Sequence, residues 1–201
     1  MQRSPAFTAP DARAVLEDLA ASGPATLVTV GPDGLSSTIV PLLVDGDRLV
    51  GHVARQNHDV LHADGTEAIA VWVGPQGYIS PSWYPSKADH GRVVPTWDYV
   101  TVQVAGPLRC TDDRRTLLDL VTRLTDRHEA GRAEPWQVAD APADHIDRLL
   151  GAIVGIELAI ERLDAKAKLS QNRPSADIDG VIEALGATDP ALAAAVRAAR
   201  P

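Results

Sequence analysis

The amino-acid sequence predicts a mainly β fold with peripheral helices, in which an antiparallel sheet closes into a small barrel. Two observations carry this prediction. Short segments rich in β-branched and apolar residues follow one another between turn sequences, as the strands of successive hairpins do. These segments do not alternate regularly with helical patterns, which argues for an antiparallel sheet and against a parallel α/β sheet.

The first part of the chain is expected to form one helix followed by hairpin strands. Asp11 is a suitable N-cap for the helix, and Gly31-Pro-Asp-Gly34 is a turn sequence that joins two strands. The near-continuous apolar run over 67–73 is typical of a strand buried on both faces. We expect, in order, a helix over 11–20, strands over 25–30, 35–44 and 48–53, a short helix over 57–63, and a strand over 67–73.

The second part is expected to hold the helices that lie outside the sheet. Leucines at helical spacing predict a helix over 112–128, and a second amphipathic pattern covers 143–150. Alternation predicts strands over 99–105 and 153–163, and Ala-rich helices stand before and after Pro190. We therefore expect a single domain over 1–201, with a helical insertion at about 112–150 and C-terminal helices at about 177–200.

Composition narrows the classes of function. The 201 residues carry a net charge of −8, which opposes sequence-independent binding to nucleic acid. No apolar run approaches the roughly 20 residues that cross a membrane, and Cys110 is the only cysteine, so we expect a cytoplasmic protein without disulfides. No metal site is predicted, because His58 and His62 lack the glutamate of a zinc-protease motif.

Aromatic residues are concentrated in one stretch, where six of the eight lie between Trp72 and Tyr99. Rigid rings next to Gly, Pro and Ser suit a pocket for a flat, partly polar ligand, although the same rings could form the core of a protein poor in Phe. Trp83, Tyr84 and Trp97 are the candidates for the ring-binding wall, since adjacent rings in a Pro-flanked, irregular segment cannot all face one core.

Lysine is used at only a few positions in this chain. Only three of the 19 basic residues are lysines, namely Lys87, Lys166 and Lys168, and a compact ammonium suits a phosphate or a tight pocket. Lys166 and Lys168 share one face if they lie in a strand. Arg55 could bind a phosphate or carboxylate with its guanidinium, or it could be a surface residue that caps the next helix. Chance usage and a solvated loop remain the alternatives for the lysines.

Four blocks of sequence resemble the PaiB family of FMN-binding proteins, which are described as negative transcriptional regulators. The blocks are Gly51-His-Val-Ala-Arg-Gln-Asn57, Gly74-Pro-Gln-Gly-Tyr-Ile-Ser-Pro-Ser-Trp-Tyr84, Val94-Pro-Thr-Trp-Asp-Tyr99 and Lys166-Ala-Lys-Leu-Ser-Gln-Asn172. The resemblance implies an FMN-binding split β-barrel that dimerises with FMN at the subunit interface. The candidate cofactor-binding residues are then Arg55, Asn57, Ser80, Trp83, Tyr84, Lys87, Thr96, Trp97, Lys166, Lys168, Gln171 and Asn172.

Two positions depart from the family pattern. Gln2 stands where the family usually has Tyr, and Asp98 stands where it usually has Asn. An acid at position 98 would repel an FMN phosphate lying close to it, so Asp98 argues against a phosphate contact at that position.

Two classes of function fit these observations. One is a transcriptional regulator of the PaiB type that acts as a flavin-bound homodimer, and the alternative is an FMN-dependent oxidoreductase or flavin reductase that acts on a small molecule. Direct DNA binding is disfavoured because no helix-turn-helix pattern accompanies the acidic charge. No acid–base pair lies beside the aromatic stretch, so catalytic residues are not assigned. This absence leaves the enzyme alternative open, because a flavin supplies redox chemistry itself. Haem handling by a related barrel is a weaker third idea, because the histidines are isolated.

Overall fold

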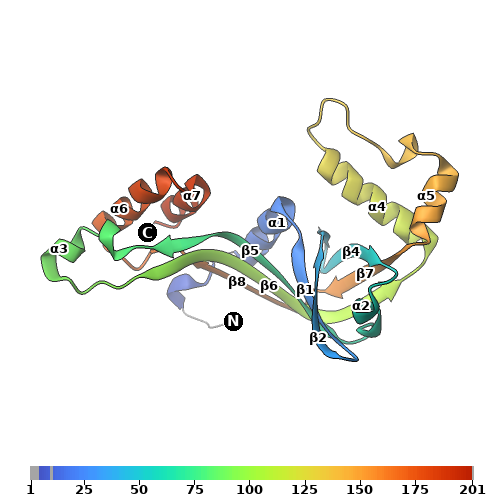
Figure 1. Ribbon diagram of the computed structural model, residues 1–201, viewed down its shortest axis with the longest axis horizontal. Helices are drawn as coiled ribbons and strands as arrows, with labels where there is room; N and C mark the ends of the chain where they lie inside the picture. The colour runs from blue at the N-terminus through green and yellow to red at the C-terminus, as the bar shows by residue number, and fades with distance from the viewer. Residues whose placement is uncertain (1–4, 10, 201) are drawn as a thin grey trace. The chain divides into compact units, whose positions relative to one another are not determined.

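The structure is a computed structural model that describes residues 5–9 and 11–200 (Figure 1). Gln2, named above as a departure from the family pattern, lies outside the described residues. The strands are β1 (Ala25–Gly31), β2 (Gly34–Val40), β3 (Leu42–Asp45), β4 (Arg48–Ala54), β5 (Glu67–Ile79), β6 (Thr96–Thr111), β7 (Ile153–Ala159) and β8 (Arg162–Lys168). The α-helices are α1 (Ala12–Ser22), α2 (His58–His62), α3 (Ser86–His90), α4 (Arg114–Glu129), α5 (Ala143–Leu150), α6 (Ser175–Gly186) and α7 (Pro190–Ala198), and short 3-10 helices are η1 (Pro5–Phe7), η2 (Pro81–Trp83) and η3 (Val138–Asp140).

The described strands form one eight-stranded sheet in the order β2-β1-β5-β6-β7-β4-β3, with β8 paired to β6. Neighbouring strands run antiparallel, for example β1 with β2 and β4 with β7. The mainly β prediction is therefore confirmed. The predicted helical insertion corresponds to α4, η3 and α5, and the predicted C-terminal helices correspond to α6 and α7.

The chain divides into two compact units, which we describe separately. Unit 1 comprises residues 1–19, 72–102 and 164–201, and unit 2 comprises residues 20–71 and 103–163. Strands β5 and β6 contribute residues to both units.

Two predicted strands are each broken in the structure. The strand expected over 35–44 stops at Val40, and β3 begins at Leu42. Pro41 between them has no backbone N–H to donate to a neighbouring strand, which explains the break. The strand expected over 153–163 also divides, because the backbone N–H of Ile160 bonds to the Asp47 carbonyl and the chain then turns to pair with β6 as β8.

Two other strands are longer than predicted. The strand predicted over 67–73 continues as β5 to Ile79. Strand β6 likewise runs from Thr96 to Thr111 instead of 99–105. Two glycines let neighbouring side chains approach the added part of β5 closely. A Cβ at Gly74 would lie 2.7 Å from Leu19 Cδ2, and a Cβ at Gly77 would lie 2.8 Å from Leu192 Cδ2.

In unit 2, helix α4 lies on the β3–β4 hairpin. Leu120 and Leu124 of α4 pack with Leu43 in one buried cluster, and Val50 lies against it. Asp113 is the N-cap of α4, because its carboxylate accepts hydrogen bonds from the Thr116 backbone at 2.8 Å and hydroxyl at 2.7 Å.

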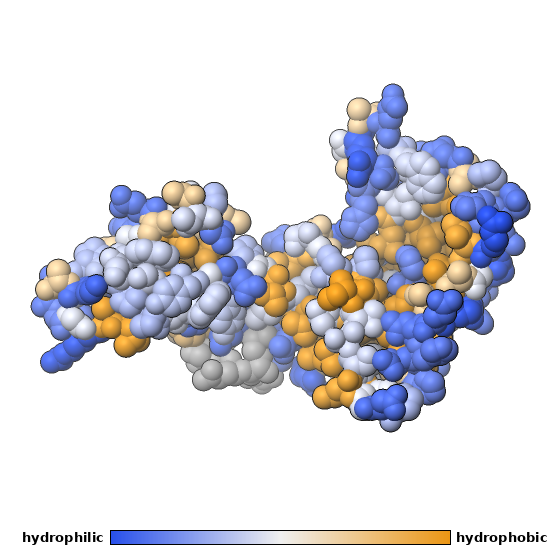
Figure 2. Space-filling model, viewed as in Figure 1, coloured by the Kyte–Doolittle hydropathy of each residue, from blue (hydrophilic) through white to orange (hydrophobic). Residues whose placement is uncertain are grey.

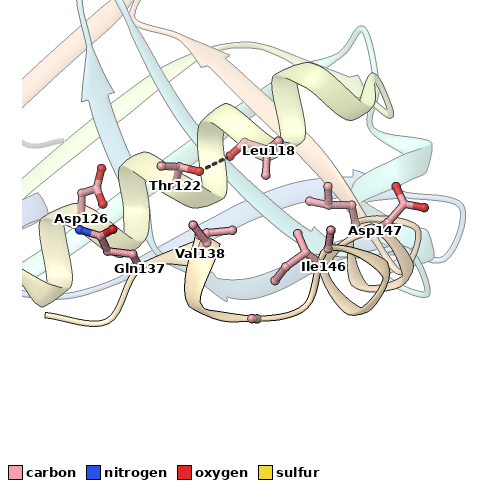
Figure 3. Close-up of a pocket in the computed structure, with 11 residues that line it drawn as sticks. Leu118, Thr122, Asp126, Gln137, Val138, Ile146 and Asp147 are labelled. Carbon is pink, nitrogen blue, oxygen red and sulfur yellow. Dashed lines mark hydrogen bonds between the residues drawn. The ribbon is translucent and has the colours of Figure 1, made fainter.

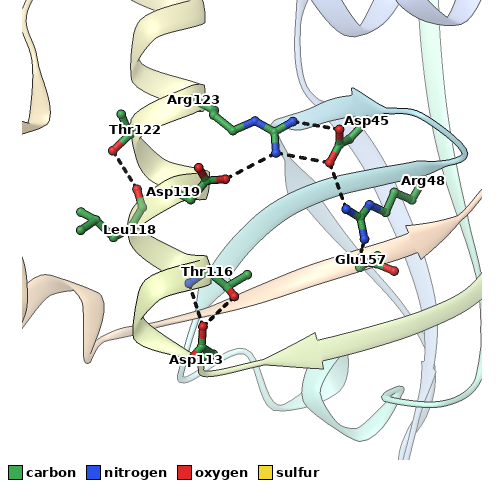
Figure 4. A network of polar contacts seen from close by, with 9 residues as sticks. All are labelled: Asp45, Arg48, Asp113, Thr116, Leu118, Asp119, Thr122, Arg123 and Glu157. Carbon is green, nitrogen blue, oxygen red and sulfur yellow. Dashed lines mark hydrogen bonds and ion pairs between the residues drawn. The ribbon is translucent and has the colours of Figure 1, made fainter.

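Charged side chains link α4 to the same hairpin at its edge (Figure 4). Arg123 of α4 forms an ion pair with Asp45 at 3.2 Å, and Arg48 joins Asp45 to Glu157 of β7. The guanidinium of Arg123 is the main cause that lowers the pKa of Asp45. These side chains are partly exposed, so the network orients α4 more than it stabilises the fold.

In unit 1, helices α6 and α7 cover the segment that follows β5. Ile178 and Val181 of α6 pack with Ile79 and Tyr84 in a buried cluster, and Trp83 lies against it. Asp177 fixes the start of α3, because its carboxylate accepts hydrogen bonds from the Ser86 hydroxyl at 2.7 Å and from the Ser86 backbone N–H at 3.1 Å.

Gly180 permits α6 to approach this segment closely. A Cβ at position 180 would lie 2.1 Å from the backbone oxygen of Trp83. We expect Gly180→Ala to lower the free energy of unfolding by about 1–3 kcal/mol in urea titrations, because the backbone of η2 must move. Gly186→Ala, in the last position of the same helix and in open space, is the matched control. Equal stability of the two variants would show that α6 does not pack on η2 this tightly.

Candidate functional site

Lys168, at the end of β8, is the centre of a polar cluster in unit 1. Its Nζ donates hydrogen bonds to Thr96 Oγ1 at 2.6 Å and to the Trp97 carbonyl oxygen at 2.5 Å. The same Nζ lies 3.4 Å from Asp98 Oδ1. The three donors of this ammonium therefore have partners inside the protein.

Asp98 is the buried counter-ion of Lys168. Its side chain is completely buried, and Oδ2 accepts a 2.6 Å hydrogen bond from the Ser170 hydroxyl. Burial raises the pKa of Asp98, while the Ser170 hydrogen bond and the Lys168 charge act in the opposite direction. The Asp98 carboxylate therefore faces Lys168, and its negative charge offsets the positive charge of the ammonium.

Lys166, two positions earlier on β8, has a different environment. It is only 7% exposed, and its Nζ lies 5.4 Å from the centre of the Tyr99 ring. Among the described residues, no carboxylate oxygen lies within 4.0 Å of this ammonium. A lysine that is held in place by packing and whose ammonium has no counter-ion suits an anionic ligand, which would supply the opposite charge.

Aromatic rings surround the two lysines. The Phe7 ring centre is 5.9 Å from Lys168 Nζ, and Trp97 packs edge-on against Tyr78 with 6.3 Å between ring centres. Trp97 is 55% exposed and Tyr78 is 48% exposed, so their faces are available to a ligand. We call Phe7, Tyr78, Thr96, Trp97, Tyr99, Lys166 and Lys168 the lysine–aromatic cluster. Cations beside exposed rings suit a flat ligand that carries an anionic group.

Trp83 and Tyr84 contribute to the core of unit 1. Tyr84 is only 2% exposed and belongs to the buried cluster under α6 and α7, while Trp83 packs against that cluster. The guanidinium of Arg173 lies 4.7 Å from the Tyr84 ring centre. Burial raises the pKa of Tyr84, and its hydroxyl has no hydrogen-bond partner among the described residues. Both rings therefore pack in or against the core. This was the alternative that the sequence left open for them.

The remaining candidates in unit 1 shape the chain locally. Ser80 caps η2 by accepting a hydrogen bond from the Ser82 N–H, and the exposed Lys87 donates to the Ser82 hydroxyl at 3.2 Å. Gln171 holds the end of β8 with bonds to the Leu169 N–H at 2.7 Å and the Ala167 carbonyl at 2.6 Å. Asn172 is exposed.

Arg55 and Asn57 lie in unit 2. The Arg55 guanidinium donates to the carbonyls of Gly151 at 2.9 Å and Ile153 at 3.2 Å, so it caps the end of α5 while 44% of its side chain stays exposed. Asn57 is the N-cap of α2 and donates from Nδ2 to Thr38 Oγ1 at 3.0 Å. Arg55 thus bonds to the end of the distant helix α5 and not to the next helix, which was the alternative considered for it, and its Nη1 lies 3.9 Å from Asp112 Oδ2.

Residues 1–162 match the family described as "Putative FMN-binding domain". The chain belongs to this family. The expectation of FMN as the cofactor is thereby confirmed at the level of the family, and the resemblance to PaiB proteins is confirmed by a curated relative, protease synthase and sporulation protein PAI 2 of Bacillus subtilis. That relative is 31% identical over 138 residues, which cover 68% of this chain and 64% of the relative.

Other curated relatives have no described function. An uncharacterised protein of Emericella nidulans is 35% identical over 127 residues, covering 58% of this chain and 51% of the relative. One of Aspergillus fumigatus is 32% identical over 168 residues, covering 67% of this chain and 64% of the relative. The chain thus spans about half to two thirds of the length of the curated relatives it matches.

Solved structures confirm the split-barrel fold. The flavocytochrome Anf3 of Azotobacter vinelandii superposes with a TM-score of 0.63 at 14% identity, covering 83% of this chain and 72% of that protein. The FAD and heme binding protein of Mycobacterium smegmatis gives 0.55 at 21% identity, covering 78% of this chain and 71% of that protein.

In the described part of the chain, no helix has both the length and the apolar character needed to cross a bilayer. Within the same residues, no three His, Cys, Asp or Glu side chains gather as the ligands of a metal ion would.

Proposed function

We propose that the protein is an FMN-binding regulator of the PaiB type, which works in the cytoplasm as a flavin-bound homodimer, and that the lysine–aromatic cluster holds the flavin. The observation that carries this proposal is Lys166, a residue that is only 7% exposed and whose ammonium has no carboxylate partner among the described residues. A phosphate carries close to two negative charges and would supply the missing counter-charge. When bound, FMN supplies redox chemistry.

The cluster residues have separate roles in this proposal. Lys166 binds the phosphate, while Lys168 positions Thr96 and the Trp97 backbone through its hydrogen bonds. The exposed face of Trp97 packs against the flavin ring and excludes water from it. Arg55, whose side chain is 44% exposed, remains a second candidate for the phosphate. The visible absorption spectrum of the purified protein tests cofactor binding, since bound flavin gives its own bands and an empty protein gives none.

Trp97 offers a direct test of ring contact. We expect Trp97→Leu to weaken FMN about fivefold, because an aromatic contact contributes on the order of 1 kcal/mol beyond area burial. Since the ring is 55% exposed, the melting temperature should stay near that of the wild type. Flavin fluorescence titrations measure the affinity, with Trp136→Leu as control. Unchanged affinity together with a lower melting temperature would assign Trp97 to the core.

The edge of the sheet supports a homodimer. Strand β2 is last in the sheet order, and its Leu35 and Ile39 are 80% and 66% exposed (Figure 2). Exposed apolar edge strands are normally covered by a partner. Light scattering should show a dimer at micromolar concentration, and Leu35→Lys with Ile39→Lys should give a monomer, whereas Leu118→Lys on α4 should not. A monomeric wild type with flavin bound would contradict the dimer.

Regulation is proposed to act through a partner, a metabolite or the redox state of the flavin, and not through direct DNA binding by this chain. The net charge of −8 opposes approach to a polyanion. Anisotropy titrations of the dimer with its own upstream DNA test this point. Submicromolar, sequence-selective binding at physiological salt would restore a direct repressor.

The second candidate is an FMN-dependent oxidoreductase that acts on a small molecule. An apolar pocket of about 310 Å³ in unit 2, described below, favours it because such a pocket can hold an organic compound. Steady-state oxidation of NADH or NADPH by the flavin-loaded protein distinguishes the two candidates, since turnover is expected of the enzyme only.

A further inference from the structure

A pocket in unit 2 has the features of a second small-molecule site. It measures about 310 Å³, and its walls come from α4, η3, α5 and the strands β4 and β7. Val121 of α4 and Ile146 and Leu149 of α5 make much of the lining apolar. In Figure 2 apolar residues reach the surface in the hollow beside these helices. This volume falls at the lower end of the range of roughly 300–1,000 Å³ that is usual for ligand pockets.

A larger hollow of about 730 Å³ adjoins this pocket and shares Val138, Ile146 and Leu150 with it. Figure 3 shows Val138 and Ile146 between α4 and the segment that runs from η3 to α5. The larger hollow is more open and ends at Asp126 and Gln137. The smaller pocket is the better candidate, because it combines apolar walls with a specific polar group.

His52 is that polar group. It lies two positions after Val50 on β4, so it shares the sheet face on which α4 packs. Its Nδ1 is buried and has no hydrogen-bond partner among the described residues. Burial lowers the pKa of His52, which keeps the imidazole neutral at neutral pH. Because Nδ1 is closed off, the atom of His52 that a ligand in the pocket can contact is Nε2, for which no hydrogen bond is found among the described residues either. Such a nitrogen in an apolar pocket favours a ligand that carries a polar hydrogen.

The other lining residues define the charge and shape of the ligand. No Lys, Arg, Asp or Glu lines the pocket, so a charged compound would lose its water without gaining a counter-ion. The phosphate of FMN is therefore a poor fit here. Trp136 lines the pocket and is 44% exposed, which offers a flat face to an aromatic ring, and Thr125 is a further lining residue.

We propose that this pocket binds a small, uncharged aromatic compound with a single hydroxyl group, which hydrogen-bonds to His52 while its ring packs against Trp136. The site is distinct from the lysine–aromatic cluster, since its lining residues belong to unit 2. The proposal does not depend on flavin binding, and its test separates the two.

The test is isothermal titration calorimetry of the purified protein with 2-naphthol, with and without saturating FMN. We expect 2-naphthol to bind equally well in both conditions and 2-naphthoate, which is charged, to bind at least tenfold more weakly. His52→Phe should weaken 2-naphthol roughly three- to tenfold, as loss of one hydrogen bond does. Val138→Trp, which fills the pocket, should abolish binding even if His52→Phe proves unstable.

His128→Phe, at an exposed position of α4, is the matched control and should leave the affinity unchanged. Four results would overturn the proposal. Competition between FMN and 2-naphthol would make the pocket part of the flavin site. Equal binding of 2-naphthol and 2-naphthoate, or an unchanged affinity in His52→Phe, would remove the assigned polar contact. Dissociation of the dimer by Val138→Trp without loss of 2-naphthol binding would identify the surface as a subunit contact.

Discussion

Replacing Lys168 with alanine should lower the free energy of unfolding by roughly 3 kcal/mol at neutral pH, the lower end of the range for breaking a buried ion pair. The side chain of Asp98 is fully buried and that of Lys168 is 21% exposed, so removal of the ammonium leaves a buried carboxylate without its counter-ion. The Ser170 hydroxyl would remain as a partner of that carboxylate at 2.6 Å. Urea unfolding measures the loss.

The experiment also uses Asp98→Asn, which gives position 98 the residue that is usual in the family. The double variant Lys168→Ala with Asp98→Asn should recover most of the lost stability, because no charge is then left buried. A double variant as unstable as Lys168→Ala would show that Lys168 stabilises the fold through Thr96 and Trp97 alone.

The pH dependence gives an independent check. Burial raises the pKa of Asp98 above its ordinary value of 3.8, so the folded protein takes up this proton before the unfolded chain does. Stability from this group therefore falls as the pH rises from 3.8 through the raised pKa. The penalty of Lys168→Ala should accordingly be largest at neutral pH and should shrink in acid, once Asp98 is protonated. A penalty that is constant from acid to neutral pH would contradict the buried carboxylate as its cause.

Replacing Lys166 with glutamine should weaken FMN by roughly 10- to 100-fold and riboflavin by far less, since a hydrogen bond to a charged group contributes about 1.5–3 kcal/mol. Riboflavin has the same ring but no phosphate, so the ratio of the two affinities isolates the anionic contact. Lys87→Gln is the matched control, because Lys87 is an exposed lysine that donates to Ser82. Equal losses for FMN and riboflavin would mean that Lys166 shapes the pocket without touching the phosphate.

The local features of the fold could be predicted from the sequence because they depend on neighbouring residues. The turn at Gly31-Pro-Asp-Gly34 sets the β1–β2 hairpin, and the leucine spacing sets α4. The spacing of Lys166 and Lys168 places both on one strand, as observed in β8. The break at Pro41 also had a local signal, since a proline inside a predicted strand cannot donate to the ladder.

The features that depend on distant residues could not be predicted in this way. Lys168 and Asp98 are 70 positions apart, so no spacing rule shows that the departure at position 98 supplies a counter-ion. Tyr84 lies in an aromatic-rich segment, which is typical of the wall of a ligand pocket. Only the packing of α6 and α7 shows that this side chain is buried. Tyr99 reaches Lys166 through the pairing of β6 with β8, and Phe7 reaches Lys168 from η1, which is far away in the sequence. Alternation along β6, which puts Tyr99 and Trp97 on one face, was an available signal.

The central claim is that the protein binds FMN through its phosphate, and the most direct measurement is a calorimetric titration of flavin-free wild-type protein with FMN and with riboflavin. The account predicts one FMN per chain, bound roughly 10- to 100-fold more tightly than riboflavin. Equal affinities for FMN and riboflavin, or no binding of either, would contradict it.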